Sequence, residues 1–370
     1  MTRTMSTTPS VDGYAMPGEF GPHARTWMIW PERPDNWRLG AKPAQEQFAE
    51  VAEAIAVSEP VTMVSSAQQW SHARDVLSAE IQVIEMSTND SWMRDCGPTF
   101  VMNADGARRV VDWEFTAWGG LLGGLYFPWD QDDLVAAKVA DIEGVDRYRA
   151  PMVLEGGSIH VDGEGTLLTT EECLLNPDRN PTLSQDEIAG LLCDYTGATK
   201  VIWLGRGVYE DETGGHVDNL ACFVRPGVVA LMWCEDRSDP MYEISLDARR
   251  RLEEATDATG RSFEVVLLPA PGPLFLTKEE ASGVDSVVGT KPRRPGDRLA
   301  ASYANYYAGT TRIVFPLLEE RTDDAARQVL QGLYPGRDVI GVPAREILLG
   351  GGNIHCITQQ VPAFDAPVEA

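Results

Sequence analysis

The chain contains Gly-Gly-Ser-Ile-His at residues 156–160 and a near copy, Gly-Gly-Asn-Ile-His-Cys, at residues 351–356. Two related stretches are Arg-Asp-Cys-Gly-Pro at residues 94–98 and Gly-His-Val-Asp-Asn at residues 215–219. Each stretch stands just before or at the start of an apolar run of the kind that forms strands. We therefore expect one structural unit to recur along the chain and to direct the polar side chains of these stretches toward one centre.

The expected unit is a pair of strands joined by a turn, then a helix, then a third strand. Helical patterns cover residues 43–58, 131–143, 185–196, 240–259 and 323–334. Strand pairs that precede them are 99–102 with 109–115, 158–161 with 165–169, 220–224 with 228–233, and 302–307 with 312–315. Third strands are expected at 60–64, 200–204, 263–268 and 338–342, with a weak counterpart near Tyr148.

The two ends of the chain complete this pattern. The first unit has one candidate strand of its pair, at residues 25–30, and the chain ends with one unpaired apolar segment, at residues 354–360. We expect these two segments to pair, because pairing removes an open sheet edge. The sequence thus predicts an α/β fold, a five-unit pseudo-symmetric α/β propeller closed by its N- and C-terminal strands, with residues 1–370 as a single domain. Residues 269–297 show no helix or strand pattern, and we expect a surface loop that helps to cover the site.

Composition narrows the range of partners. The formal charge is 31 − 56 = −25, which makes nucleic acid and anionic membranes poor partners, although the same acidity also suits plain solubility. No apolar run approaches the roughly 18 residues that span a bilayer, and no secretory signal pattern is present. The six scattered cysteines form no Cys-x-x-Cys pair, which favours a reduced, cytoplasmic chain.

The candidate chemistry lies in the quoted stretches, which supply a thiol, an imidazole and three carboxylates: Cys356, His216, Asp95, Glu155 and Asp218. Cys356 follows three glycines, which let backbone approach a ligand closely. The alternative for any such thiol is a buried structural role; we accept that role for Cys193, Cys222 and Cys234, and Cys96 is ambiguous because it adjoins Asp95.

His216 and Asp218 would project together from a strand, and an imidazole beside a carboxylate suits a general acid/base. The alternative is a polar strand start. His160 and His355 hold matching places in the repeat, and we expect them to orient their loops by hydrogen bonding. Because no short His-x₃-His or Cys-x₂-Cys spacing occurs, we do not expect a metal site.

The acids indicate the charge of the substrate. Carboxylates near a thiol raise its pKa, so an ordinary cysteine hydrolase has few of them there. Several acids around Cys356 make sense when the substrate itself is a cation. A guanidinium group fits best, because it pairs with carboxylates through two parallel hydrogen bonds.

The whole set of motifs resembles the agmatine deiminases, a family in the guanidine-modifying superfamily with the pentein propeller fold. The resemblance runs from about residue 12 to 362, and the stretches that carry it are Met-Pro-Gly-Glu-Phe at 16–20, Trp-Met-Ile-Trp-Pro at 27–31, Arg-Pro-Asp-Asn-Trp-Arg at 33–38, Trp-Met-Arg-Asp-Cys-Gly-Pro at 92–98, Ala-Trp-Gly-Gly at 117–120, Glu-Gly-Gly-Ser-Ile-His at 155–160, Asp-Glu-Thr at 211–213, Gly-His-Val-Asp-Asn at 215–219 and Gly-Gly-Gly-Asn-Ile-His-Cys-Ile-Thr-Gln-Gln at 350–360.

The resemblance implies a role for each candidate residue. Cys356 would be the nucleophile and His216 the acid/base. Asp95 and Asp218 would hold the guanidinium, and Glu155 would support it or His216. Side chains expected around the rest of the substrate are Trp92, Trp118 and Glu212, and the backbone of Gly351 is expected to contact it.

The implied substrate is agmatine, the products are N-carbamoylputrescine and ammonia, and related enzymes assemble as dimers or larger homo-oligomers. Here Gly214-Gly215 replaces a more usual Asn-Gly or Asn-Glu, which would loosen the loop that carries Glu212. Glu212 could instead merely cap that loop. Alternative functions are deimination of free arginine or of peptidyl-arginine, and a non-enzymatic binding scaffold.

Overall fold

The computed structural model describes residues 2–364, whose seventeen strands form five sheets. The first sheet has the order β1 (Tyr14–Ala15), β5 (Thr99–Asn103), β6 (Arg108–Glu114), β7 (Arg147–Val153). The second contains β8 (His160–Val161), β9 (Thr166–Thr170) and β10 (Lys200–Leu204). The third contains β11 (Ala221–Arg225), β12 (Val228–Trp233) and β13 (Glu264–Pro269). The fourth contains β14 (Tyr307–Ala308), β15 (Arg312–Leu317) and β16 (Asp338–Pro343). The fifth has the order β17 (Thr358–Pro362), β2 (His23–Ile29), β3 (Val61–Ser65), β4 (Gln82–Glu85).

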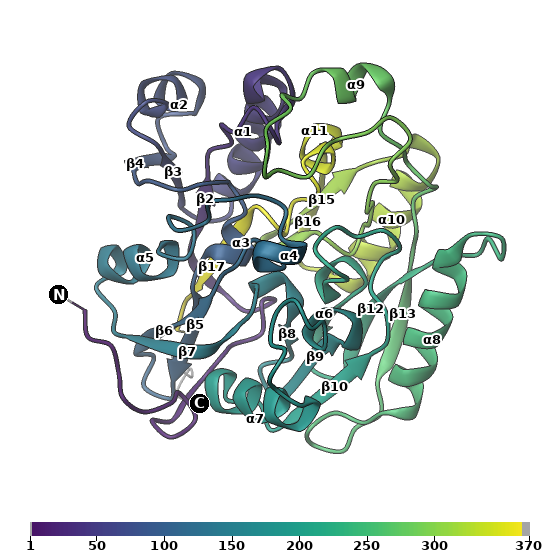
Figure 1. Cartoon of the computed structure of the whole chain (residues 1–370). Helices are drawn as coiled ribbons and strands as arrows, with labels where there is room; N and C mark the ends of the chain where they lie inside the picture. Colours follow the sequence, from purple (N-terminus) through teal and green to yellow (C-terminus); the bar gives the residue numbers. More distant parts are fainter. Residues whose placement is uncertain (1, 365–370) are drawn as a thin grey trace.

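The same pairing recurs in every sheet: two antiparallel strands, then a third strand parallel to the second. A helix links the two parallel strands, and these helices lie on the outside of the molecule (Figure 1). They are α1 (Lys42–Ala56), α5 (Val135–Glu143), α7 (Gln185–Thr196), α8 (Pro240–Glu254) and α10 (Glu320–Leu333). The predicted order of hairpin, helix and strand is therefore present.

The linking helices cover the sheets with their apolar faces. In α1 the residues spaced three and four apart, Phe48, Val51, Ala52 and Ile55, are all buried. Helix α7 begins with the predicted capping box of Ser184 and ends at Gly197, whose φ of 73° is left-handed. Shorter helices are α2 (Trp70–Val76), α3 (Met93–Cys96), α4 (Gly120–Gly123), α6 (Glu171–Leu174), α9 (Lys278–Ser282) and α11 (Arg345–Leu349). Turns of 3₁₀ helix are η1 (Arg38–Ala41), η2 (Gly156–Ser158) and η3 (Val217–Asn219).

The two ends of the described chain pair with each other. Strand β17 lies antiparallel to β2, with Thr358 opposite Met28 and Gln360 opposite Thr26. The structure therefore contains the pairing that was expected between the N- and C-terminal strands. No helix within residues 2–364 has the length and apolar character needed to cross a bilayer.

Several predicted boundaries were wrong. Helix α8 ends at Glu254 and not at 259, because the Asp257 carboxylate accepts hydrogen bonds from the N–H groups of Thr259 and Arg261 and fixes a turn there. The loop at 269–297 contains helix α9, which begins with a capping box of Thr277 and Glu280. The strand near Tyr148 is a full strand of seven residues, β7.

Candidate active site

The predicted site residues lie in the connections between one sheet and the next. Asp95 is in α3, between β4 and β5; Glu155 lies between β7 and β8; and Asp218 is in η3, between β10 and β11. Cys356 occupies the connection from α11 to β17. Because the connection is the same part of each unit, the repeated fold brings these distant parts of the sequence to one place.

Three of these side chains meet over Gly157. A Cβ atom on Gly157 would lie 2.7 Å from His216 Nδ1, 2.8 Å from Asp218 Oδ2 and 2.9 Å from Asp95 Oδ1. The Gly157 N–H also donates to Asp95 Oδ1 over 3.0 Å. Any side chain at position 157 would therefore displace the acids and the imidazole, so glycine is needed here for close approach.

The expected strand geometry of His216 and Asp218 was wrong. These residues belong to a 3₁₀ turn, with His216 preceding η3 and Asp218 inside it. Both side chains lie beside Gly157. Neither His216 ring nitrogen has a well-aligned hydrogen bond to any residue within 2–364, although Nε2 lies 3.4 Å from Glu155 and Nδ1 lies 3.8 Å from Asp95.

Cys356 is 2 % exposed and is held by Asn305. The Asn305 side-chain N–H group donates to Cys356 Sγ over 3.2 Å, and its oxygen accepts from the His355 N–H over 2.9 Å. The thiol lies 3.7 Å from Asp218 Oδ2. The Trp92 ring packs directly on Gly352, where a side chain would collide with it and crowd Cys356.

Burial and like charges keep the thiol protonated. Burial raises the pKa of Cys356 well above its ordinary value, and Asp218 and Asp95 raise this pKa further. The direction agrees with the expectation from the sequence, although burial is the larger cause. Burial also raises the pKa of the Asp95 carboxyl to about 6, with Asp218 and Glu155 adding to the shift.

The acids around His216 favour the charged form of its imidazole. Burial opposes ionisation of His216, but the nearby Asp95 carboxylate raises the pKa of the imidazole well above its ordinary value. Glu155 is also ionised, since Arg179 overcomes the effect of burial and lowers the pKa of Glu155 to about 2. These shifts favour a neutral thiol, an imidazolium and an ionised Glu155, an arrangement that suits a cationic substrate.

Sequence reasoning missed two residues, Arg179 and Asn305. Arg179 Nε lies 2.9 Å from Glu155 Oε2, and both side chains are fully buried. No motif surrounds Arg179, so its role could not be predicted from the local sequence. Asn305 stands two residues before β14, as Cys356 stands two residues before β17. The spacing within the repeat could have identified Asn305.

Trp118 contacts the site through a hydrogen bond. Its indole N–H donates to Asp95 Oδ2 over 2.9 Å, and its ring lies edge-on to Trp92 with 6.4 Å between the ring centres. Ala117 and Trp118 have φ angles of 51° and 66°, a left-handed conformation that costs about 1 kcal/mol or more for residues other than glycine. In this backbone conformation the indole N–H reaches Asp95.

The outer end of the site carries paired charges. Glu212 lies 2.6 Å from Arg293 and 3.1 Å from Lys291, and a side chain at Gly351 would collide with Glu212. Glu212, Arg293 and Lys291 line one narrow pocket together with Trp92 and Trp118. Both cations belong to the loop at 269–297, so this loop lies at the outer end of the site.

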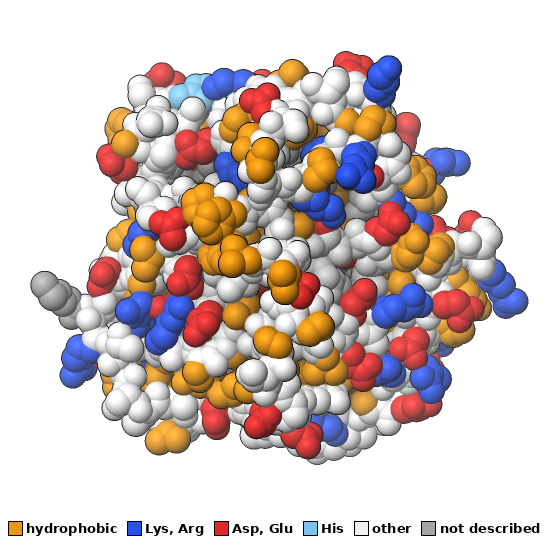
Figure 2. Space-filling view, viewed as in Figure 1, with side chains coloured by type: hydrophobic (Ala, Val, Ile, Leu, Met, Phe, Trp, Pro, Cys, Tyr) orange, Lys and Arg blue, Asp and Glu red, His pale blue; other side chains and the backbone are white. Residues whose placement is uncertain are grey.

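Exposed apolar side chains follow Trp118 in the sequence. Leu121 and Leu122 of α4 are 81 % and 90 % exposed, and they follow Trp118 closely in the sequence. Figure 2 shows hydrophobic side chains gathered on the face turned to the viewer, over the region where α4 lies in Figure 1.

Two buried groups have the composition of metal ligands within the described chain. One is Glu155, Cys173 and His216; the other is Glu19, His160 and His355. In the first group Glu155 is already neutralised by Arg179, which leaves little reason for a cation there.

Comparisons with known proteins agree along the whole chain. The family described as Porphyromonas-type peptidyl-arginine deiminase matches residues 15–362. A relative from Latilactobacillus sakei is 60% identical over 362 residues, which cover 98% of this chain and 99% of the relative. The agmatine deiminase of Pseudomonas aeruginosa is 56% identical, with 97% and 98% covered. The solved structure of Enterococcus faecalis agmatine deiminase is 51% identical, with a TM-score of 0.96 and coverage of 98% and 100%.

Proposed function

This chain belongs to the Porphyromonas-type peptidyl-arginine deiminase family, and we propose that it hydrolyses agmatine to N-carbamoylputrescine and ammonia. The observation that carries the proposal is the meeting of His216, Asp218 and Asp95 over Gly157, next to a buried thiol. The named activity of the full-length relatives supports it. No cofactor takes part in the proposed reaction.

In the first half of the reaction, Asp95 and Asp218 hold the guanidinium beside Cys356. The substrate cation offsets the two acids that raise the pKa of the thiol, so binding favours the thiolate, and the thiol proton passes to solvent. The thiolate attacks the central guanidinium carbon. His216, already an imidazolium, gives its proton to the departing nitrogen, which leaves as ammonia.

In the second half, a thiouronium on Cys356 is hydrolysed. His216 is now neutral and takes a proton from water, which attacks the same carbon. Collapse of the adduct releases the ureido product and restores the thiol. Glu155, fixed by Arg179, stays ionised beside His216 Nε2 and stabilises the imidazolium whenever His216 carries its second proton.

For the fold, we infer a five-unit propeller of the pentein type that forms a single domain. Of the residues 1–370 expected in this domain, residues 1 and 365–370 lie outside the described part of the chain. The recurrence of one pairing order in five sheets supports the inference, as does the pairing of β17 with β2. Such a ring would place all the connections that carry site residues around one axis.

We further propose a cytoplasmic homo-oligomer, dimeric or larger, with a small-molecule substrate. Six free cysteines among the described residues support a reducing compartment. Analytical ultracentrifugation of the purified protein tests the assembly, and a monomer at micromolar concentration would contradict it.

A second candidate substrate is free arginine, because of one specific observation. Arg293 and Lys291 stand at the outer end of the pocket, where they could receive an α-carboxylate. Glu212 disfavours the binding of free arginine, since Glu212 already pairs with both cations and would repel the α-carboxylate.

The experiment that tests the function is a substrate panel. Agmatine, free arginine and an arginine-containing peptide are incubated with the wild type and with Cys356→Ser, and both ureido product and ammonia are measured. We expect product from agmatine in large excess over the other two, and none from the variant. Turnover of the peptide or of arginine at a higher kcat/KM than agmatine would overturn the proposal.

A further inference from the structure

The segment Met16–Phe20 is one of the motifs, yet it supplies no group to the proposed reaction. Its acid, Glu19, is 6 % exposed. Glu19 Oε1 accepts from Arg94 Nη1 over 2.8 Å, and Glu19 Oε2 lies 2.8 Å from His355 Nε2. A residue that precedes the first long strand therefore reaches the residue that adjoins Cys356.

His355 stands between two carboxylates. Its Nε2 faces Glu19 over 2.8 Å, and its Nδ1 faces Asp218 Oδ2 over 2.8 Å. A carboxylate only accepts hydrogen bonds, so both ring nitrogens must carry protons if both acids are ionised. Arg94 keeps Glu19 ionised, since together with His355 it lowers the pKa of Glu19 well below its ordinary value against the effect of burial.

The other oxygen of Asp218 is free for a ligand. Asp218 is 1 % exposed, and its Oδ1 has no hydrogen-bond partner within residues 2–364. An unpaired buried oxygen of a carboxylate is costly unless a donor arrives. Because His355 fixes Oδ2, it also fixes the direction in which Oδ1 points.

A metal ion does not account for this cluster. Glu19, His160 and His355 lie close enough to hold one, but the Phe223 N–H donates to His160 Nδ1 over 3.3 Å. The proton of a neutral His160 is then on Nε2, which faces Glu19 as a donor and not as a ligand. Glu19 also has its charge neutralised by Arg94.

We propose that Glu19 and His355 are positioning residues: Glu19, held by Arg94, keeps His355 doubly protonated, and His355 keeps Asp218 ionised and aimed at the substrate guanidinium. The assignment of Asp218 to the guanidinium rests on the proposed function. The chain of contacts Arg94–Glu19–His355–Asp218 does not depend on it.

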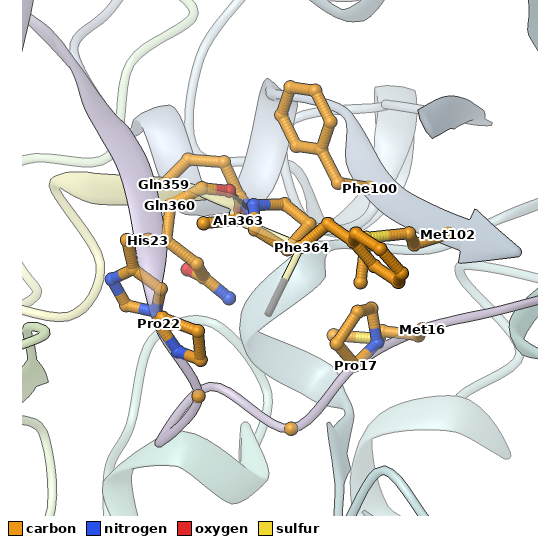
Figure 3. A pocket seen from close by; sticks show the side chains of 13 residues that line it. Met16, Pro17, Pro22, His23, Phe100, Met102, Gln359, Gln360, Ala363 and Phe364 are labelled. Atoms are coloured by element: carbon orange, nitrogen blue, oxygen red, sulfur yellow. Dashed lines mark hydrogen bonds between the residues drawn. The ribbon is translucent and has the colours of Figure 1, made fainter. Parts of the chain in front are cut away.

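The backbone of Glu19 makes a polar contact of its own. The Glu19 carbonyl accepts a hydrogen bond from His23 Nε2 over 2.9 Å, and His23 in turn pairs with Glu59. The segment that leads to Glu19 borders a pocket of about 260 Å³, which Figure 3 shows between Pro17 and Pro22 on one side and Phe100 and Met102 on the other.

Glu59 offers a matched control for Glu19. Each is a buried acid bonded to a buried histidine, and Glu59 supports the same segment through His23. Only Glu19 belongs to the chain that ends at Asp218. Glu19→Gln removes the charge from the chain, whereas Glu59→Gln removes a similar charge outside it.

The first measurement is a ¹⁵N NMR titration of the histidines in the free enzyme, without substrate. The chain has five histidines, and His355→Asn assigns the signal of interest. Groups that face His355 directly or through Asp218 are Glu19, Asp218, Arg94, His160, Cys356, His216 and Asp95, and those beside it in a small pocket are Cys222, Tyr306 and Tyr334.

We expect His355 to keep both ring protons above the ordinary histidine pKa of ~6.5. The two acids raise the pKa of His355 although burial and Arg94 oppose this. Glu19→Gln should lower the pH at which the second proton leaves, and Glu59→Gln should not. A wild-type His355 with one ring proton at neutral pH, or a titration that Glu19→Gln leaves unchanged, would overturn the proposal.

The second measurement is kcat/KM for agmatine. Glu19→Gln should lower it about 10- to 100-fold, the factor expected when a hydrogen bond between charged groups is lost. Glu19→Asp, which keeps the charge, should recover part of the loss, and Glu59→Gln should stay near the wild type. Equal losses in Glu19→Gln and Glu59→Gln would mean a merely structural role and would contradict the proposal.

The two proposals can fail separately. A wild type that does not turn over agmatine refutes the proposed function, and the titration still decides the state of His355. If Glu19→Gln does not fold, the wild-type titration alone remains decisive, because a His355 with an ordinary pKa would refute the positioning role.

Discussion

At the scale of single residues, the site depends on positions that have no side chain. Gly157 lets an imidazole and two acids meet, Gly352 admits the Trp92 ring, and Gly351 admits Glu212. These contacts explain why the decisive stretches of sequence are rich in glycine. The acids then set the charge of the site. The pKa shifts of Asp95, Glu155 and Asp218 differ because each carboxyl group has a different partner.

The first prediction concerns the proposed guanidinium clamp. Asp95→Asn and Asp218→Asn keep the shape and remove the charge, so each should cost about 2–5 kcal/mol of transition-state stabilisation. The measurement is kcat/KM for agmatine. Asp112→Asn is the control, because Asp112 is a buried acid paired with Arg147 and Arg149 outside the site, and it should keep wild-type kcat/KM. Near-normal activity in both clamp variants would refute the clamp.

The second prediction concerns Arg179. Glu155 has a pKa of about 2 in the folded protein against an ordinary 4.5, so its ionisation adds stability above pH 4.5 that is lost as pH falls toward 2. Arg179→Gln breaks the buried ion pair of Arg179 with Glu155 and should cost roughly 3–5 kcal/mol at neutral pH. The loss should shrink on acidification as Glu155 becomes protonated.

Chemical denaturation of both proteins between about pH 3 and pH 7 checks this prediction. Arg249→Gln is the control, since Arg249 forms an exposed pair with Glu253 that should contribute little. A stability difference between the wild type and Arg179→Gln that does not change with pH would show that Glu155 is not the group involved.

The third prediction concerns ionisation of the thiol. Burial, Asp218 and Asp95 raise the pKa of Cys356, so alkylation of the free enzyme by neutral iodoacetamide should be slow at neutral pH and should accelerate as pH rises. Peptide mapping assigns the rate to Cys356. Fast alkylation that is flat from about pH 6 to pH 9 would show that the thiolate forms before substrate binds.

At the scale of elements, the sequence predicts those helices and helix ends that local sequence patterns determine. Helix α7 was visible because its capping box and its terminal glycine are both local signals. The end of α8 could not be predicted in this way, because the turn at Asp257 competes with the helix through side-chain hydrogen bonds. His216 and Asp218 were paired correctly for the wrong reason, since a 3₁₀ turn replaces the expected strand.

Contacts between distant parts of the chain explain what the sequence could not show at the site. Arg179 reaches Glu155, and Glu19 reaches His355 across 336 positions. Neither contact corresponds to a regular residue spacing in the sequence, so neither could be predicted from it. Asn305 differs, because the repeat places it where Cys356 stands in the next unit.

The fourth prediction concerns the loop at 269–297, which is tied to the outer end of the site. Arg293 bonds to Glu212 and to the Gly350 carbonyl, and the Lys291 N–H donates to the Leu125 carbonyl over 2.8 Å. If Glu212 receives the agmatine ammonium, Glu212→Gln should weaken agmatine binding and narrow its preference over arginine.

The ratio of kcat/KM for agmatine and arginine, in the wild type and in Glu212→Gln, checks this prediction. A Glu212 that only anchors its loop would give a less stable variant with an unchanged ratio. That result would remove Glu212 from the binding site. Glu210→Gln is the control. Glu210 lies in the same loop as Glu212, but it does not line the narrow pocket with Trp92 and Trp118.

At the scale of the whole molecule, repetition brings scattered residues together. Each sheet repeats one pairing order, each connection between sheets can supply one part of the site, and the pairing of β17 with β2 joins the last unit to the first. The chain carries a formal charge of −25, and several of its acids are buried around one thiol. Such an arrangement is suited to a substrate that brings its own positive charge.

The most direct test of the central claim is mass spectrometry of the wild type after rapid quenching during turnover of agmatine. The account predicts a covalent adduct derived from the guanidinium carbon, located on the peptide that contains Cys356, and no such adduct in Cys356→Ser. Loss of turnover in that variant should exceed about 10³-fold. An adduct on Cys96 instead, or turnover by Cys356→Ser at the wild-type rate, would contradict the account.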